Sequence, residues 1–272
     1  WKGSGAMFNV YVTRKLPGKG LSKLDSRCRV TIFPKARPIT KEELLAVVPK
    51  QDALITMLSD PIDAEVIAAG PNLKVIANYA VGFNNIDLSA ATARKLPVLN
   101  TPGVLTAATA DLTWALLTAA ARRVVEGDQM TRAGKFHGWA PELLLGVEIF
   151  GKTLGLIGAG RIGQAVAQRA LGFEMKILYQ NRNRLPESVE HKLNMEYTDL
   201  ETLLKKSDFV SLHCPLTPET KHLIGAEELN LMKPTAVLIN TARGPVIDEE
   251  ALVRALQKGT IYSAGLDVFE DE

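Results

Sequence analysis

The sequence predicts an α/β protein made of two units, each built around a parallel β-sheet. Two observations carry this prediction: short β-rich runs alternate with helical runs along nearly the whole chain, and a glycine-rich turn joins a strand to a helix near its middle. The chain of 272 residues, 46% hydrophobic, is long enough for two modest cores. We expect the units to be residues 7–102 and 103–272, with a hinge at the Pro-Gly pair.

The first unit is predicted to alternate strands with helices. The strand candidates are 8–13, 28–33, 53–58, 74–80 and 97–101, and the helix candidates are 40–48, 63–70 and 87–95. Thr40 and Glu43 form a T-x-x-E capping box, and Asp87 can cap the helix that it begins. Residues 1–6 precede Met7 and resemble a vector-derived remnant, so we exclude them from the fold.

The second unit is predicted to begin with a long helix over 108–127. After a loop around 133–141, the strand candidates are 152–158, 175–180, 208–214, 235–240 and 262–269, separated by helical runs at 161–171, 199–206 and 248–259. The whole chain lacks internal repeats and low-complexity tracts.

Charge and composition exclude several classes of protein. The 32 Lys and Arg against 30 Asp and Glu give a net charge of +2, too close to neutral for a nucleic-acid or membrane-surface protein. Cys28 and Cys214 are far apart and lack a metal-like spacing, so we expect a reducing compartment, no disulfide framework and no metal. Since no apolar run is long enough to span a bilayer and no signal peptide is visible, we expect a cytoplasmic protein.

The segment GAGRIG, residues 158–163, has the G-x-G-x-x-G form between an apolar strand and a helix. In this context the motif binds dinucleotides, and a turn that merely favours glycine is the weaker alternative. Gly158 permits a tight turn, Gly160 lets a pyrophosphate approach the backbone, and Gly163 lets the helix pack close to the strand. Phosphates are expected at the helix N-terminus, beside Arg161 and Ile162, where N–H groups and the helix dipole favour anions.

The end of the next strand indicates which dinucleotide is bound. In an NAD site a carboxylate at this point binds the ribose hydroxyls and would repel a 2′-phosphate. The residues found here are Asn181, Arg182, Asn183 and Arg184. Guanidinium groups pair well with phosphate, so we expect NADP(H) to be preferred and NAD(H) to remain possible. The alternative is that both arginines are solvated loop charges.

Arg243 follows the strand candidate 235–240 in the segment TARGPVIDEEAL. An arginine just past the carboxyl end of a parallel strand faces the crevice where open α/β sheets bind ligands. Because a guanidinium group holds a carboxylate through two parallel hydrogen bonds, Arg243 is a candidate for binding the carboxylate of a 2-oxo acid.

Four ordered segments give the chain a specific resemblance. They are GAGRIG (158–163), LHCPLTPETKHLI (212–224), INTARGPVIDEEAL (239–252) and AGLDVFEDE (264–272). Together with residues 78–103 they resemble the D-2-hydroxyacid dehydrogenase family, most of all its glyoxylate/hydroxypyruvate reductase branch. The resemblance implies two Rossmann-like parallel-sheet domains, a flavodoxin-like substrate domain and a dinucleotide-binding domain. It also implies reduction of glyoxylate or hydroxypyruvate, to glycolate or D-glycerate, by hydride transfer, and residues 181–184 predict that NADPH is the preferred cofactor.

The resemblance assigns roles to particular residues. Arg243 would be the catalytic arginine that binds the substrate carboxylate, together with the backbone amides of Val81 and Gly82. Glu272 would be the catalytic glutamate that keeps a histidine protonated. The remaining residues implied to contact the cofactor are Thr109, Cys214, Thr241, Ala242 and Asp267, the last of them at the nicotinamide carboxamide.

The family's catalytic histidine lies beyond the position of Glu272, so no histidine of this sequence corresponds to it. His213 corresponds to a structural histidine of the family, and the others, His137, His191 and His222, read as surface or variable-region residues. We therefore expect the sequence to be a fragment, without the C-terminal tail that in the family completes the substrate domain.

Two other functions remain open, and the assembly state is implied only by the resemblance. An NAD-linked relative such as a phosphoglycerate dehydrogenase would need basic residues near Val81, and a dinucleotide-sensing corepressor would use the same fold for association. The family implies a homodimer formed through the cofactor domain. The apolar residues around Trp114 and Leu117 are candidates for this contact, or for packing within their own subunit, and Trp139 is another candidate.

Overall fold

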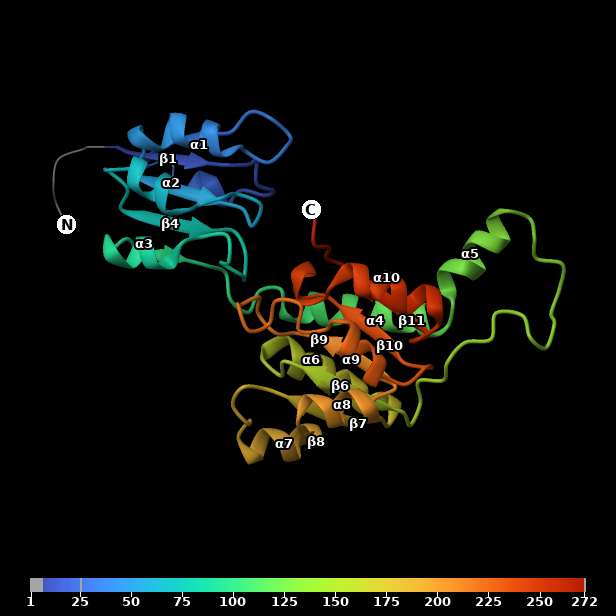
Figure 1. Cartoon of the computed structure of the whole chain (residues 1–272). Coiled ribbons are helices and arrows are strands. Elements are labelled where there is room, and N and C mark those ends of the chain that lie inside the picture. Colours follow the sequence, from blue (N-terminus) through green and yellow to red (C-terminus); the bar gives the residue numbers. More distant parts are fainter. Residues whose placement is uncertain (1–6, 25, 272) are drawn as a thin grey trace. The chain divides into compact units, whose positions relative to one another are not determined.

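The computed structural model describes residues 7–24 and 26–271. The chain divides after Val104 into two compact units, which can be followed by colour in Figure 1. The predicted division, after residue 102, lies just before this point. Within the described ranges no helix is both long and apolar enough to cross a membrane.

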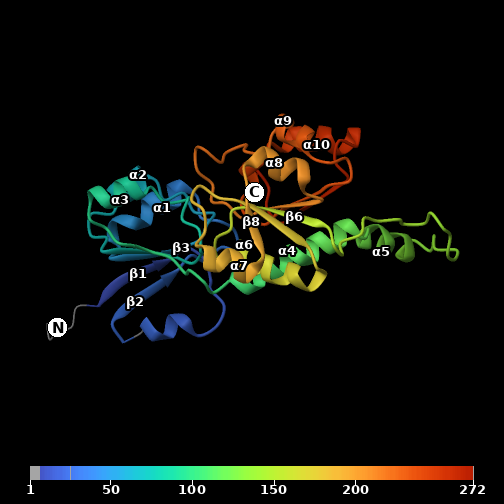
Figure 2. The same cartoon turned by 90° about the horizontal axis from the view of Figure 1, so that it is seen from below.

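The first unit is one parallel sheet with helices packed on one face. Its strands are β1 (Phe8–Val12), β2 (Cys28–Ile32), β3 (Ala53–Thr56), β4 (Val75–Asn78) and β5 (Val98–Leu99). Its helices are α1 (Lys41–Val47), α2 (Ala64–Ala69) and α3 (Leu88–Ala93), with 3-10 turns at Gly20–Leu24 and Val48–Lys50. The strand order is β2-β1-β3-β4-β5, and Figure 2 shows the three helices together on one side of the sheet.

The core of the first unit follows from the alternation along its strands. On β3 and β4 buried residues alternate with half-buried ones, so Leu54 and Ile76 face the helices and pack on Leu44 and Val66. The opposite face carries an apolar groove, lined by Phe8, Val10, Cys28, Ala53, Ile55, Val75, Ala77 and Leu99 among others.

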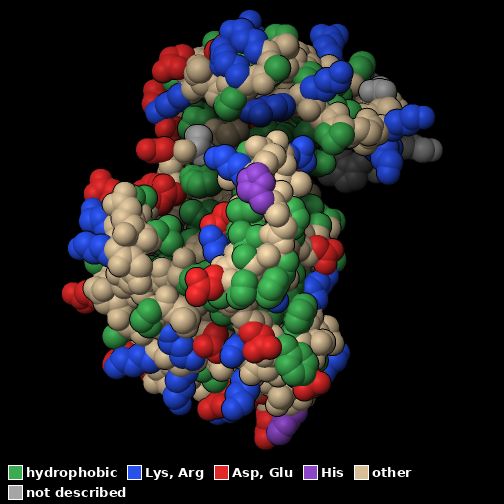
Figure 3. Space-filling view, turned by 90° about the vertical axis from the view of Figure 1, so that its right-hand side faces the viewer, with side chains coloured by type: hydrophobic (Ala, Val, Ile, Leu, Met, Phe, Trp, Pro, Cys, Tyr) green, Lys and Arg blue, Asp and Glu red, His purple; other side chains and the backbone are tan. Residues whose placement is uncertain are grey.

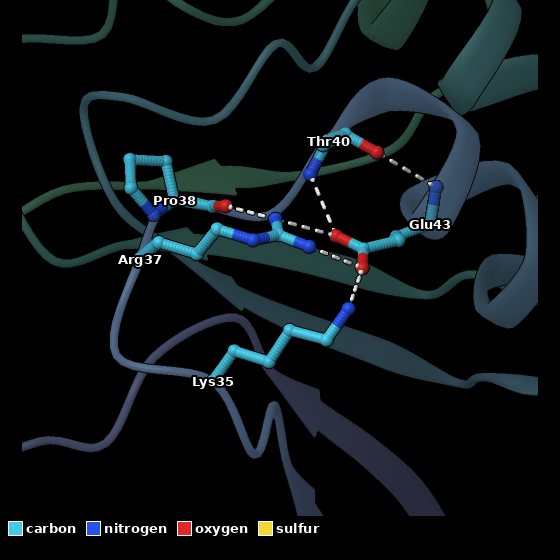
Figure 4. A network of polar contacts seen from close by, with 5 residues as sticks. All are labelled: Lys35, Arg37, Pro38, Thr40 and Glu43. Atoms are coloured by element: carbon cyan, nitrogen blue, oxygen red, sulfur yellow. Dashed lines mark hydrogen bonds and ion pairs between the residues drawn. The ribbon is translucent and has the colours of Figure 1, made fainter.

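Both predicted helix caps of this unit are confirmed. The Thr40 hydroxyl accepts from the Glu43 N–H, and the Glu43 carboxylate accepts from the Thr40 N–H at 3.1 Å. Figure 4 shows that Lys35 and Arg37 also donate to Glu43, which holds the pKa of this carboxyl well below its usual range. The Asp87 carboxylate accepts from the Ala90 N–H at 2.9 Å at the start of α3.

The second unit is a larger parallel sheet covered on both faces. Its strands are β6 (Thr153–Ile157), β7 (Lys176–Gln180), β8 (Met195–Tyr197), β9 (Phe209–Leu212), β10 (Val237–Asn240) and β11 (Ser263–Leu266). Its helices are α4 (Thr106–Ala121), α5 (Val124–Arg132), α6 (Arg161–Ala170), α7 (Glu187–Leu193), α8 (Leu200–Lys206), α9 (Ala226–Leu231) and α10 (Glu249–Lys258), with 3-10 turns at Leu171–Phe173 and Gly244–Val246. Figure 2 shows α4, α6 and α7 on one side of the sheet and α8, α9 and α10 on the other.

The strand order is β11-β10-β9-β6-β7-β8, with all strands parallel, and the side on which successive strands are added changes at β6. The chain runs outward from β6 to β7 and β8, and then returns to β9 on the other side of β6. Open α/β sheets bind their ligands at such a reversal, outside the carboxyl ends of the strands. The predicted fold class, two Rossmann-like parallel-sheet domains, is confirmed.

The prediction of one continuous helix over 108–127 is wrong, because the structure has two helices there. The helix α4 ends at Ala121, Arg123 adopts a left-handed conformation with φ of 54°, and α5 begins at Val124. The Val147 N–H donates to the Ala121 carbonyl at 2.8 Å, so the returning chain takes an acceptor at the helix end. Because this partner is distant in sequence, the break could not be predicted from local pattern.

Candidate functional site

The glycine-rich turn between β6 and α6 leaves no room for side chains at two of its glycines. Gly158 has a φ of +95°, and a Cβ there would lie 2.6 Å from the Cys214 nitrogen. A Cβ at Gly163 would lie 2.3 Å from the Gly158 carbonyl oxygen. Gly160 differs, since nothing lies within 4 Å of where its Cβ would be. This side of the turn is therefore open to a ligand.

The N-terminus of α6 offers backbone N–H groups beside this opening. Gly160 is the N-cap residue, and no side chain caps the helix. The first-turn N–H groups, which include those of Arg161 and Ile162, point along the positive end of the helix dipole. An open glycine next to an uncapped helix start fits the pyrophosphate of a dinucleotide.

Asn181 links the end of β7 to the glycine-rich turn. Its Oδ1 accepts from the Ala159 N–H at 2.7 Å, and its carbonyl accepts from the Tyr197 hydroxyl at 3.3 Å. The position of the following loop is thus fixed relative to the turn.

Arg182 and Arg184, which the sequence pairs as one phosphate-binding element, have different surroundings. The Arg184 guanidinium donates twice to Glu190, at 2.9 and 2.8 Å, and lies 6.0 Å from the centre of the Tyr197 ring. The Tyr179 hydroxyl also donates to Glu190 and accepts from the Leu185 N–H. The bonds from Arg184 and Tyr179 lower the pKa of Glu190 to about 2. Arg182 and Asn183 are exposed.

The loop after β10 carries Arg243 and is held by a buried asparagine. The Asn240 Nδ2 donates to the Arg243 carbonyl at 2.8 Å, and its Oδ1 accepts from the Ala242 N–H at 3.0 Å. The Arg243 Nη1 donates to the Ala242 carbonyl at 2.6 Å. Since Asn240 is 1% exposed, these bonds give the loop a defined course.

Two contacts join other predicted cofactor residues to this loop. The Thr241 and Thr113 hydroxyl oxygens lie 2.9 Å apart, and Thr113 donates to the Thr109 carbonyl one turn earlier in α4. The Asp267 N–H donates to the Asn240 carbonyl at 3.0 Å, and the Asp267 side chain is exposed at the end of β11. Glu272 lies outside the described residues.

Gly244 explains why the chain after Arg243 can pass so close to the segment that follows β11. A Cβ at Gly244 would lie 1.9 Å from the Phe269 carbonyl oxygen, so any side chain would displace that segment. The two segments therefore meet through their backbones, at the same edge of the sheet as the glycine-rich turn.

His213 and Cys214 follow β9 and pack against the glycine-rich turn. His213 is half-buried by surface area, but protein surrounds its ring, and this desolvation lowers its pKa to about 4. Its Nε2 lies 2.9 Å from the Ser211 hydroxyl. Burial likewise raises the pKa of the Cys214 thiol to about 11. Both groups are neutral near pH 7, which suits packing rather than proton transfer.

The other described histidines lie on the surface. His222 is 3.0 Å from the Glu270 carboxylate, His191 is 3.3 Å from Glu187, and His137 is exposed. Among the described residues, no group of three or more His, Cys, Asp or Glu side chains could hold a metal ion.

The first unit presents Val81 and Gly82 in the loop that follows β4. Both residues are half-buried, and their carbonyls accept hydrogen bonds from Asn100 and Asn78. Sequence reasoning missed these asparagines, as it missed Asn240 and the partner of Arg184. The asparagines could have been found because each ends or directly follows an apolar strand, where a polar side chain can hold the next loop.

Comparison with known proteins identifies the family. Residues 114–272 match the D-isomer specific 2-hydroxyacid dehydrogenase, NAD binding domain. The chain belongs to this family. It is an NAD(P)-dependent oxidoreductase.

Relatives align along nearly the whole of this dehydrogenase chain. A glyoxylate reductase of Thermococcus gammatolerans is 53% identical over 267 residues, which is 97% of this chain and 80% of the relative. The structure of the TT0316 protein from Thermus thermophilus superposes with a TM-score of 0.90, at 51% identity over 97% of this chain and 83% of that one. The structure of a glyoxylate reductase from Paecilomyes thermophila superposes with a TM-score of 0.88, at 36% identity. The match covers 98% of this chain and 83% of that one.

Proposed function

We propose that this dehydrogenase reduces glyoxylate, hydroxypyruvate or both, giving glycolate and D-glycerate, with NADPH preferred over NADH. The proposed substrate is supported by the 53% identity, over 97% of the chain, to a relative that is named a glyoxylate reductase. Hydroxypyruvate differs from glyoxylate by a hydroxymethyl group in place of hydrogen, a change that pocket contacts of about 1–3 kcal/mol would discriminate.

Each unit has residues suited to holding a carboxylate. Arg243 provides a guanidinium group on a loop that the Asn240 bonds hold in place. In the first unit, the backbone amides of Val81 and Gly82 are the proposed donors to a carboxylate. Carboxylate binding orients the 2-oxo carbon for reaction, which lowers the barrier by fixing geometry.

The cofactor domain has the features that a dinucleotide requires. The open side of Gly160 and the first turn of α6 take the pyrophosphate, and Asp267 takes the nicotinamide carboxamide. The bound nicotinamide dinucleotide supplies the hydride for the reduction. Thr109, Cys214, Thr241 and Ala242 line its site through α4 and the ends of β9 and β10.

The preference for NADPH rests on the charges at the end of β7. No carboxylate occupies positions 181–184, and the nearby Glu190 is paired with Arg184, so it does not repel a 2′-phosphate. Arg182 is exposed and provides the positive charge for that phosphate.

The protein is further proposed to form a homodimer through its cofactor domain. The segment of α5 and the loop that follows carries apolar side chains that are more than half exposed: Val124, Val125, Phe136, Trp139 and Leu145. Figure 3 views the side of the molecule on which this segment lies, and green apolar side chains gather there. An apolar surface of this kind marks a protein contact.

Steady-state kinetics of the full-length protein test the proposed function. Glyoxylate, hydroxypyruvate and phosphohydroxypyruvate are compared, each with NADPH and NADH. We expect a higher kcat/KM with NADPH and turnover of one or both of the first two acids. Faster reduction of phosphohydroxypyruvate, or a higher kcat/KM with NADH, would contradict the proposal.

A further inference from the structure

The loop that follows β4 is held by hydrogen bonds to two successive carbonyl groups. The Asn100 Nδ2 donates to the Val81 carbonyl at 2.8 Å, and the Asn78 Nδ2 donates to the Gly82 carbonyl at 2.8 Å. Carbonyls only accept, so in both asparagines the amide nitrogen faces the loop and the orientation of the side chain is fixed. The two asparagines end β4 and follow β5, which are neighbours in the sheet.

These bonds determine where the N–H groups of the same peptides point. In a trans peptide the N–H points opposite to the C=O, and the described chain has no cis peptide bond. The Gly82 N–H is therefore directed away from Asn100, and the Phe83 N–H is directed away from buried Asn78. Among the described residues, neither N–H has a hydrogen-bond acceptor.

Asn78 is itself fixed by buried polar groups. It is 2% exposed, its Oδ1 accepts from the Thr56 hydroxyl at 2.9 Å, and its Nδ2 also donates to Asn85 at 3.1 Å. Asn85 in turn donates to the Met57 and Asp60 carbonyls at 2.9 and 3.1 Å. Because Asn78 is buried and both ends of its side-chain amide are hydrogen-bonded, it is held in one rotamer, and the loop is set before any ligand arrives.

We propose that Asn78 and Asn100 are positioning residues, which direct the Gly82 and Phe83 N–H groups toward the carboxylate of the substrate. This inference rests on the proposed function of the loop and deepens it, since it names what orients the Gly82 amide and adds the Phe83 amide as a second donor beside it. Neither asparagine touches the substrate. Each donates a hydrogen bond to a loop carbonyl and so fixes the orientation of that peptide group. The N–H on the other side of the peptide can then donate to an anion.

The test uses the full-length protein and the variants Asn100→Leu and Asn78→Ser. Asn72→Leu is the matched control, because Asn72 also donates to a backbone carbonyl of this unit, that of Pro49, but on the exposed surface. Both positioning variants are expected to raise the KM for glyoxylate, and the Ki of the unreactive carboxylate oxamate, by about ten-fold or more. Because the carboxylate is bound in the ground state and the transition state alike, kcat and the KM for NADPH should change little.

A merely structural role would lower kcat and thermal stability without raising the KM for glyoxylate. If Asn100→Leu keeps this KM and the oxamate Ki within two-fold of the control, the inference is overturned, even where buried Asn78 proves too sensitive to replace. Failure of the proposed function is a separate result, in which the wild type itself does not reduce glyoxylate. Oxamate binding measured by calorimetry then decides alone: ten-fold weaker binding to Asn100→Leu supports the positioning role, and equal binding rejects it.

Discussion

Arg184 forms a two-bond ion pair with Glu190, at 2.9 and 2.8 Å, and this pairing separates it from Arg182, which is exposed two positions earlier. The sequence alone presents the two arginines as one element. The structure gives Arg184 a carboxylate of its own chain, whereas Arg182 is exposed and has a charge interaction with Glu219 but no hydrogen bond or ion pair among the described residues. The first two predictions follow from this difference.

Arg182→Ala should raise the KM for NADPH by about ten-fold or more, since a charge-assisted contact to phosphate is lost, and should leave the KM for NADH nearly unchanged. Arg184→Ala should affect the NADPH KM less and should reduce stability, because it leaves the Glu190 carboxylate with the Tyr179 hydroxyl but without its cation. Steady-state kinetics with both cofactors and thermal unfolding separate these effects. Arg254→Ala, an exposed arginine on α10, is the control. Equal effects of Arg182→Ala on the two cofactors would rule out its role at the 2′-phosphate.

Glu190→Gln should destabilise the protein at neutral pH and make little difference in acid. The hydrogen bonds from Arg184 and Tyr179 lower the folded-state pKa of Glu190 to about 2, below its ordinary value of 4.5. A lowered carboxyl pKa gives stability that is present above the unfolded-state pKa and is lost as pH falls toward the folded-state value. The free energies of unfolding of wild type and variant should therefore converge between about pH 5 and pH 2. Denaturant titrations at several pH values measure this, and a gap that stays constant with pH would refute it.

The burial of His213 predicts a second pH dependence of stability. Here the folded protein disfavours the charged form of the side chain, whereas at Glu190 it favours the charged form. Burial lowers the folded-state pKa of His213 to about 4 from an ordinary value of 6.5. Between these values the unfolded chain binds more protons than the folded one, so stability rises with pH across this window and is lost toward pH 4. His213→Asn should weaken this loss, by about 1–3 kcal/mol at the acid end. Unfolding followed from pH 7 to pH 4 tests it, and parallel curves for wild type and variant would be the contrary result.

Local signals sufficed to predict much of this fold. The capping box at Thr40, the cap at Asp87 and the glycine turn at 158–163 depend on residues close in sequence, and the structure contains all of them. The strand periodicity also placed the candidate site at the carboxyl ends of the sheet, since parallel strands bring their ends to one edge.

The features that sequence could not supply depend on contacts between distant segments. The end of α4 depends on Val147, and the orientation of the loop at Val81 depends on Asn100. The pairing of Arg184 with Glu190 joins a loop residue to α7 across the helix start at Pro186, so neither helical nor strand spacing predicts it. In each case the sequence shows a residue that can form the contact, but it does not show which distant residue is the partner.

The exposed apolar segment that begins with α5 predicts how the proposed dimer can be dissociated. Trp139 is 83% exposed and Leu145 is 61% exposed, and both would be buried against a second copy of the chain. Placing a charge at an apolar contact leaves it unpaired and desolvated, so Trp139→Glu and Leu145→Glu should each weaken the dimer by about 2 kcal/mol or more. Light scattering coupled to size exclusion, over a dilution series, measures the shift to monomer. Val253→Glu, at an apolar residue of α10 that is 52% exposed, is the matched control and should leave the mass unchanged. A wild type that is monomeric at every concentration, or a control that dissociates as readily, would show that this surface does not form the dimer.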